Sequence, residues 1–140
     1  YTGGLWASKG LSILDFGVVY NGYTSDTTLT IAKGPLTAAQ EKQLELVQKA
    51  YDECVKLYKP GRPIMEAAKK ADSIFAAAKR KMPHTLGHAI GLEIHEKPGM
   101  ILTCEPGLYD VKIGGTRLEN DVLITEDGNE VITHSRIIRI

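Results

Sequence analysis

The sequence lacks net charge, long apolar runs and a framework of cysteines. Its 17 basic and 17 acidic residues cancel, so charge gives no reason to expect nucleic acid or an anionic membrane as a partner. The apolar runs are too short to cross a bilayer, and no signal peptide is recognisable after Tyr1. The two cysteines, Cys54 and Cys104, lie far apart in a helix-like and a strand-like segment. This arrangement does not indicate a disulfide, so we expect a protein of the reducing cytoplasm.

What is present is the composition of an ordinary globular domain, with 43% hydrophobic and 24% charged residues. We therefore expect residues 1–140 to form one domain with a core of its own. The chain starts at Tyr1 without an initiator methionine, so we expect it to be a fragment of a longer protein.

The first part of the chain predicts a β-hairpin. β-branched and aromatic residues fill residues 11–31, and Asn21-Gly22 interrupts the run near its middle. This dipeptide between two β-prone segments is the strongest short-range signal for a hairpin.

Two helices and further strands follow, which together predict the α+β class. Apolar residues recur at helical spacing after Thr37, which matches a capping box with Gln40, and Pro60-Gly61 ends this helix. Pro63 begins a second helix. Four further strands are expected at residues 84–95, 100–109, 117–125 and 130–140, with turns at Gly114-Gly115 and Asp127-Gly128.

Two aspartates lie in the predicted hairpin, where charged side chains are unusual unless they are paired or bound to something. Asp15 ends an apolar run, and Asp26 lies on the returning strand. A turn centred on Asn21-Gly22 places them on one face as diagonal neighbours, with Cβ atoms about 7 Å apart. Carboxylates that close repel each other unless a cation or a shared proton lies between them. For this pair alone, a turn cap and a solvated edge residue is an equally open interpretation.

Glu105 and Glu119 raise the same question in the C-terminal part. Glu105 ends the apolar run in GMILTCEPG, and Glu119 has apolar neighbours in GTRLENDVLI. Alone, Glu105 fits a salt bridge at a strand end, and Glu119 fits an ion pair with Arg117 on the same strand face. A two-residue turn at Gly114-Gly115 would place the two glutamates on opposite faces, so a shared site requires a bulge or a different loop.

Three of the chain's four histidines lie in the segment HTLGHAIGLEIHE, at positions 84, 88 and 95. Each of them alone fits a structural role. Gly87 and Gly91 flank His88, however, and allow its backbone to approach another element closely. Four carboxylates in apolar settings and one imidazole form an oxygen-rich ligand set, which suits two divalent ions better than one closed zinc site. A pair of cations explains all five residues together.

Four segments in this order resemble the pita-bread metallopeptidases: LDFGVVYNGYTSDTT, HTLGHAIGLEIHE, CEPGLY and TRLENDVLI. This family includes aminopeptidase P, Xaa-Pro dipeptidase (prolidase) and methionine aminopeptidase. The resemblance covers the chain from about Leu11 onward. It implies the pita-bread fold, a curved antiparallel sheet with flanking helices, and it implies that this chain holds the latter part of one catalytic domain.

The resemblance also implies a role for each candidate residue. The ligands of a dinuclear site would be Asp15, Asp26, His88, Glu105 and Glu119. His95 would contact the scissile carbonyl, His84 would line the substrate pocket near the prolyl residue, and Arg117 would support the ligands. A hydroxide bridging two Mn, Co or Zn ions would attack the peptide carbonyl, with Glu105 as the proton shuttle.

Within the family, EPGLY and TRLEND resemble the proline-specific branch. The implied activity is hydrolysis of the Xaa-Pro bond in peptides with proline at the second position, carried out by a homodimer without nucleic acid or a membrane. Two alternatives stay open: a methionine aminopeptidase or other aminopeptidase of the same fold, and a non-catalytic module that binds peptides.

The sequence departs from the family pattern at several points. A further active-site histidine of the family would precede Tyr1, and the loop between Pro98 and Gly99 is shorter than usual. Leu29 replaces a common arginine, and Cys104 replaces a common aliphatic residue.

Overall fold

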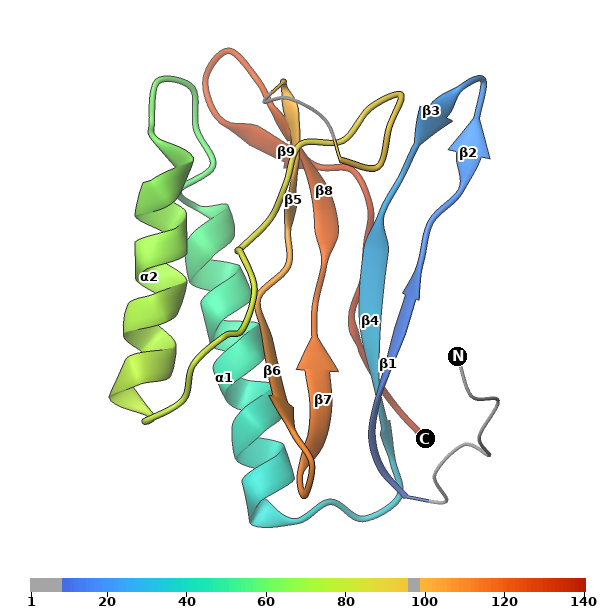
Figure 1. The fold of residues 1–140 in the computed structure, drawn as a ribbon, viewed down its shortest axis with the longest axis vertical. Coiled ribbons are helices and arrows are strands. Elements are labelled where there is room, and N and C mark those ends of the chain that lie inside the picture. Colours follow the sequence, from blue (N-terminus) through green and yellow to red (C-terminus); the bar gives the residue numbers. More distant parts are fainter. Residues whose placement is uncertain (1–8, 96–98) are drawn as a thin grey trace.

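The computed structural model describes residues 9–95 and 99–140, which form a mixed α+β fold (Figure 1). None of the helices in these residues has the length and apolarity needed to cross a membrane. The helices are α1 (Ala38–Val55) and α2 (Ile64–Ala77). The strands are β1 (Gly10–Phe16), β2 (Val19–Tyr20), β3 (Tyr23–Thr24), β4 (Thr27–Lys33), β5 (Ile101–Cys104), β6 (Gly107–Asp110), β7 (Gly114–Arg117), β8 (Asn120–Ile124), β9 (Asn129–Val131) and β10 (Ile137–Arg139).

The described strands pair in three groups, with strand orders β10-β4-β1-β7-β6, β2-β3 and β5-β8-β9. Three links join the described N-terminal strands to the C-terminal ones. β4 pairs with β10 in parallel, Leu11 of β1 pairs with Gly114 of β7 in parallel, and Thr28 of β4 forms an isolated antiparallel bridge with Glu119. The bridge between Thr28 and Glu119 lies at the candidate site.

The N-terminal strands form the hairpin that the sequence predicts. The register of β1 and β4 places Asp15 opposite Thr28, and β2 pairs with β3 next to the turn. Asn21 and Gly22 have positive φ angles of 51° and 86°, which a two-residue turn of this kind requires. The predicted turn is confirmed.

The two helices lie next to each other on one side of the strands (Figure 1). α1 begins with the predicted capping box, in which the Thr37 hydroxyl accepts from the Gln40 amide at 3.3 Å. α1 contacts β5, β6 and β7, and α2 packs against α1.

The strands β5 to β8 have the core on one face and the candidate site on the other. Cys104, Leu108, Leu118 and Val122 are buried in the core that includes the helices. Because side chains alternate between the faces of a strand, Glu105 and Glu119 point to the opposite side, which carries the candidate site.

The segment 84–95 is not a regular strand, so this prediction is wrong. It lies antiparallel to β5, with Thr103 N donating to His88 O at 2.7 Å and Glu105 N donating to Leu86 O at 2.8 Å. The amide of His88 instead donates to the Thr103 hydroxyl at 3.0 Å, which interrupts the backbone ladder. Only an isolated bridge, between Ala89 and Leu102, is formed in this described segment.

The turn predicted at Gly114-Gly115 is also wrong, because β7 starts at Gly114. The turn lies at residues 111–113, where the Asp110 carboxylate accepts from the amides of Lys112 at 2.8 Å and Ile113 at 3.2 Å. An aspartate before a turn commonly stabilises it in this way. The resulting register pairs Gly107 with Arg117 and Cys104 with Asn120, so Glu105 and Glu119 lie on the same face without a bulge.

The single strand expected at 100–109 is divided in two, and the strand expected at 117–125 corresponds to β8, with only Arg117 belonging to β7. β5 ends at Cys104 and β6 begins at Gly107, because Pro106 has no amide hydrogen for a ladder. The interruption on the other side lies at Leu118 and Glu119, between β7 and β8. Both breaks therefore lie at a candidate ligand.

Candidate metal centre

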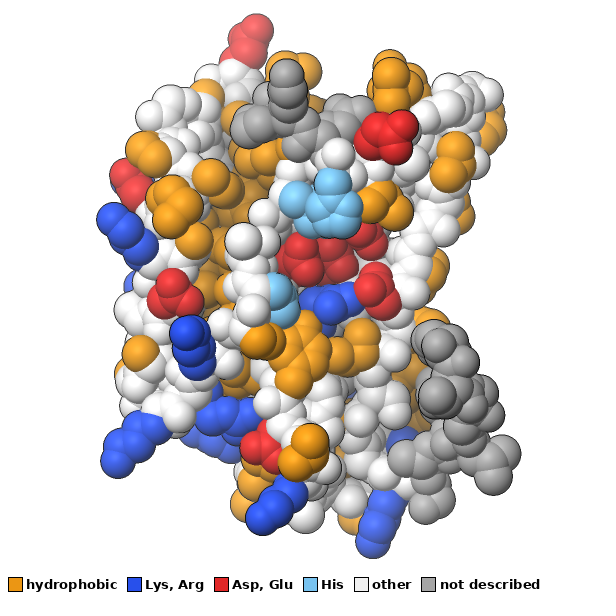
Figure 2. All heavy atoms as spheres, in the orientation of Figure 1, with side chains coloured by type: hydrophobic (Ala, Val, Ile, Leu, Met, Phe, Trp, Pro, Cys, Tyr) orange, Lys and Arg blue, Asp and Glu red, His pale blue; other side chains and the backbone are white. Residues whose placement is uncertain are grey.

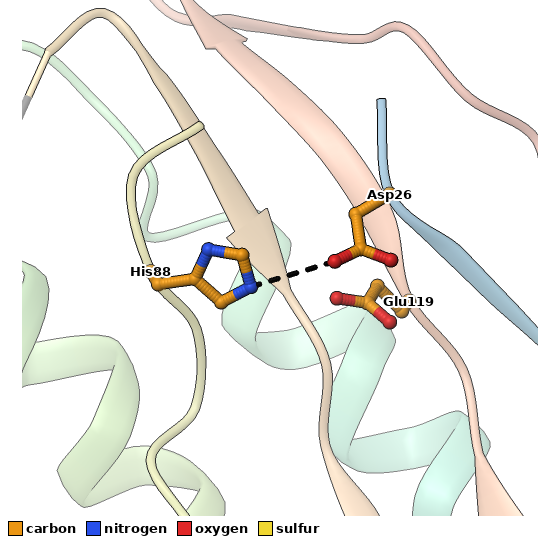
Figure 3. A group of neighbouring side chains, drawn as sticks. All are labelled: Asp26, His88 and Glu119. Carbon is orange, nitrogen blue, oxygen red and sulfur yellow. Dashed lines mark ion pairs between the residues drawn. The ribbon is translucent and has the colours of Figure 1, made fainter. Parts of the chain in front are cut away.

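Asp26, His88 and Glu119 converge on one point (Figure 3). A ligand atom from each lies within 4.8 Å of those from the other two. Asp26 comes from the connection between β3 and β4, His88 from the segment beside β5, and Glu119 from the break between β7 and β8. Glu119 is buried, and the other two are partly buried. Figure 2 shows acidic side chains gathered at the centre of this face, between two patches of histidine.

His88 presents a ring nitrogen to two carboxylates without a hydrogen bond to either. Its Nε2 lies 3.6 Å from Asp26 Oδ2 and 3.6 Å from Glu105 Oε1, which is too long for a hydrogen bond. The other nitrogen, Nδ1, lies 3.2 Å from the carbonyl of Ala89 and must donate to it. In the neutral imidazole, Nε2 is then an unprotonated acceptor that faces negative oxygens.

Asp15 lies at the edge of this group, half exposed. Its carboxylate pairs with the Arg117 guanidinium and lies 3.1 Å from the Thr28 hydroxyl. The same hydroxyl lies 2.5 Å from Glu119 Oε2. The Thr28 hydroxyl therefore links Asp15 to Glu119, although Asp15 is not part of the group formed by Asp26, His88 and Glu119.

Arg117 connects the ligand group to His84. Its Nη1 donates to the Tyr109 hydroxyl at 3.1 Å, and that hydroxyl lies 2.7 Å from His84 Nε2. Because His84 Nδ1 faces the carbonyl of Thr85 at 2.8 Å, Nδ1 carries the hydrogen in the neutral ring and Tyr109 donates to Nε2. The expected pairing of Arg117 with Glu119 is present but long, at 3.8 Å.

His95 lies against His88, with ring centroids 4.0 Å apart and planes inclined by 36°. The segment after it, which includes Glu96 and the Pro98-Gly99 junction, has residues 96–98 outside the described part of the chain. All the residues expected from the sequence therefore lie in one region, with Asp26, His88 and Glu119 at its centre.

The pKa values of the clustered carboxyl groups show how unfavourable the cluster is without a counter-ion. Burial is the main reason that the pKa of Glu119 is raised to about 8. The negative charges of Glu105 and Asp26 also raise this pKa, and the hydrogen bond from Thr28 lowers it. Burial also raises the pKa of Glu105. Burial and the charge of Asp15 raise the pKa of Asp26. Desolvation and repulsion both penalise the charged forms here.

The donor set fits divalent cations. Carboxylate oxygens and a neutral imidazole are ligands for such ions, and a ligating histidine commonly donates its other N–H to a backbone carbonyl, as His88 does to Ala89. A cation among Asp26, His88 and Glu119 would replace repulsion with attraction.

The sequence analysis missed four residues that support the group. Thr28 and Thr103 are fully buried threonines, and Asp121 is a buried carboxylate. Burial raises the pKa of Asp121 to about 6. The fourth, Tyr109, links Arg117 to His84. Only Asp121 carried a visible signal, since it follows Glu119 at strand spacing in an apolar run.

The family of this chain follows from the match between its sequence and a family model. The model of metallopeptidase family M24 matches residues 3–126, which is most of the chain. This chain belongs to metallopeptidase family M24.

Members with known names and structures are close to this M24 chain. The Xaa-Pro dipeptidase of Pyrococcus furiosus is 39% identical over 141 aligned positions, which cover 88% of the chain and 39% of that protein. The crystal structure of the prolidase from Pyrococcus horikoshii OT3 has a TM-score of 0.86 at 37% identity, covering 89% of this chain and 40% of that one. The X-Pro aminopeptidase from Thermotoga maritima MSB8 has a TM-score of 0.85 at 27% identity, covering 93% of this chain and 40% of that one.

These comparisons confirm the pita-bread fold and the expected resemblance. The M24 chain spans about two fifths of the length of these relatives. Membership of a metallopeptidase family agrees with the cation-binding chemistry of the donor set.

The metal-free M24 chain is expected to lose stability as the pH rises from about 4.5 to about 8. In this window folded Glu119 keeps a proton that the unfolded chain, with an ordinary glutamate pKa of 4.5, has released. The unfolded state binds fewer protons, so the free energy of unfolding falls with pH, by a few kcal/mol at most. Urea unfolding in the presence of a chelator, at several pH values, measures the slope.

Glu119→Gln is the control for this prediction, because it removes the titrating group. The difference in stability between wild type and this variant should change with pH in that window. Mn²⁺ at about 100 times its dissociation constant should stabilise the wild type by about 2.7 kcal/mol. A difference that is flat across the window would contradict the prediction.

Proposed function

We propose that this chain is the metal-binding part of a peptidase that cleaves the bond between an N-terminal residue and proline, and that it uses two divalent cations, Mn, Co or Zn. The observation that carries the proposal is the convergence of Asp26, His88 and Glu119, whose ligand atoms lie within 4.8 Å of one another, with His88 Nε2 also 3.6 Å from Glu105 Oε1. The printed names of the Pyrococcus and Thermotoga relatives support the proline-specific branch.

The number of cations follows from the ligand set. We propose that Asp26 and Glu119 bridge the two ions, because Asp26 lies beside His88 and the Thr28 hydroxyl links Glu119 to Asp15. The charges of four carboxylates exceed what one divalent ion neutralises. When bound, the pair would lower the pKa of a water molecule and polarise the peptide carbonyl.

Three side chains of this chain are placed to act on a peptide. Glu105 has a raised pKa, which suits a carboxyl group that takes up and returns a proton. His95 lies beside His88, from where we propose that it contacts the scissile carbonyl. His84 is held by Tyr109, and we propose that it contacts the prolyl residue.

Arg117 holds Asp15 and Tyr109 at the same time. We propose that it fixes the orientation of the Asp15 carboxylate and, through Tyr109, of His84. A homodimer is a further proposal from the resemblance. A cytoplasmic location is a proposal supported by the two free, buried cysteines.

Substrate choice tests the proposal. The purified chain with Mn²⁺, Co²⁺ or Zn²⁺ should release the first residue from Xaa-Pro dipeptides and not from Met-Ala peptides, as measured by chromatography of the products. Cleavage of Met-Ala peptides instead would move the protein to the methionine aminopeptidase branch. Metal binding with no hydrolysis of either peptide would favour the binding module.

A further inference from the structure

We propose that Thr28, Thr103 and Asp121 are positioning residues that hold the candidate ligands in place and so set the affinity for metal. Each of the three is hydrogen-bonded to a different part of the ligand set, and together they reach all five proposed ligands. The inference rests on the proposed metal centre.

Thr28 serves the Asp15 and Glu119 carboxylates. Its side chain is fully buried, and its hydroxyl lies 2.5 Å from Glu119 Oε2 and 3.1 Å from Asp15 Oδ1. The same oxygen accepts from Arg117 Nε at 3.0 Å. The hydroxyl accepts from the guanidinium and has a single hydrogen to donate, which the Glu119 and Asp15 carboxylates share, so it links the positions of these two groups.

Thr103 serves His88 and Glu105. Its fully buried hydroxyl accepts from the His88 amide at 3.0 Å and lies 3.4 Å from Glu105 Oε1, to which it donates. These two interactions use the single donor hydrogen of the hydroxyl and one of its two acceptor lone pairs. This is the hydrogen bond that interrupts the strand at His88, so the irregular backbone there places the imidazole.

Asp121 serves Asp26. Its Oδ2 accepts from the Asp26 amide at 3.2 Å, and its Oδ1 is buried with no hydrogen-bond partner. A buried carboxylate oxygen without a partner among the described residues is costly. Asp121 lies directly opposite Thr103 in the β5–β8 register, so these two positioning residues are neighbours on adjacent strands.

Buried threonines elsewhere in the sheet have a different pattern of partners. Thr116 is as buried as Thr28 and Thr103, but its hydroxyl accepts from Gln43 of α1 at 3.1 Å, on the helix side of the strands. Thr116 therefore provides a matched control: the same residue type and burial, without contact to a candidate ligand.

The test compares Mn²⁺ binding by titration calorimetry with the melting temperature of the metal-free chain. Thr28→Val and Thr103→Val remove a hydroxyl at nearly constant shape and should each weaken binding about 10- to 100-fold, as loss of outer-shell partners does in other metal sites. Thr28→Ser and Thr103→Ser keep the hydroxyl and should restore most of the affinity. Thr116→Val should lower the melting temperature and leave the affinity unchanged.

Asp121 needs its own pair of variants. Asp121→Asn keeps an oxygen for the Asp26 amide and should bind Mn²⁺ more tightly than Asp121→Ala, which removes it.

The outcomes separate this inference from the proposed function. A wild-type chain that binds no Mn²⁺, Co²⁺ or Zn²⁺ would overturn the metal centre itself. A wild-type chain that binds metal, together with valine variants that bind it equally well, would overturn the positioning role alone. Loss of affinity in Thr116→Val equal to that in Thr28→Val would also overturn it, since general destabilisation would then explain the effect.

Discussion

Asp26→Ala is expected to abolish peptide hydrolysis while the chain still folds. Asp26 contributes one of the three grouped candidate ligand atoms, and its replacement would remove one of the two carboxylates that we propose to bridge two ions. We expect kcat/KM to fall by about 10³-fold or more, equivalent to about 4 kcal/mol of transition-state stabilisation. Steady-state hydrolysis of an Xaa-Pro dipeptide at saturating Mn²⁺ measures the loss.

The fold should tolerate this change for a physical reason. Asp26 lies between β3 and β4, outside the strand ladders, and its carboxylate is repelled by Asp15. The melting temperature of the metal-free variant should therefore equal or exceed that of the wild type. Asp72→Ala, at an exposed position on α2, is the control with normal turnover. An Asp26→Ala chain with unchanged turnover would remove Asp26 from the ligand set.

Gly87→Ala is expected to damage both stability and metal binding. A Cβ at this position would lie 1.9 Å from the carbonyl oxygen of Thr103, so the segment that carries His88 must move away from β5. This movement breaks the bond from Thr103 N to His88 O at 2.7 Å. Overpacking against a backbone atom costs about 1–3 kcal/mol or more, and displacement of His88 should weaken Mn²⁺ binding at the same time.

Urea unfolding and calorimetry measure the two effects of Gly87→Ala. Gly128→Ala is the matched control, because the nearest atom to its added Cβ is Thr125 Oγ1, at 4.0 Å. Gly128→Ala should change neither quantity appreciably. If Gly87→Ala unfolds at the wild-type urea concentration, the close approach of this segment to β5 is not a constraint on the fold.

The elements that depend on neighbouring residues were predictable. The turn at Asn21-Gly22 and the capping box of Thr37 and Gln40 are local arrangements, and both are present. The segment 84–95 failed because its shape depends on Thr103, a residue that becomes a neighbour only in the folded chain. The Gly114-Gly115 turn failed because the Asp110 side chain organises a turn just before it.

The candidate ligands were visible in the sequence for a different reason. A carboxylate such as Glu119 in an apolar strand is conspicuous in sequence, whereas a threonine such as Thr28 or Thr103 is common in strands and gives no signal. The sequence also contained no information on the partner of Asp15, which the fold brings to Arg117. The sequence therefore identified most of the charged residues of the candidate site, but it missed Asp121 and the neutral residues that contact them.

The bridge between Thr28 and Glu119 joins residues that are 91 positions apart in the chain. The hairpin and the helices can form from residues that are near each other in sequence. The bridge between Thr28 and Glu119 forms only when the N-terminal strands and the C-terminal strands have come together. The candidate metal centre is thus formed by two parts of the chain that are far apart in sequence, so a truncation that removes either part would remove candidate ligands. Each bound ion would then cross-link these two parts of the chain.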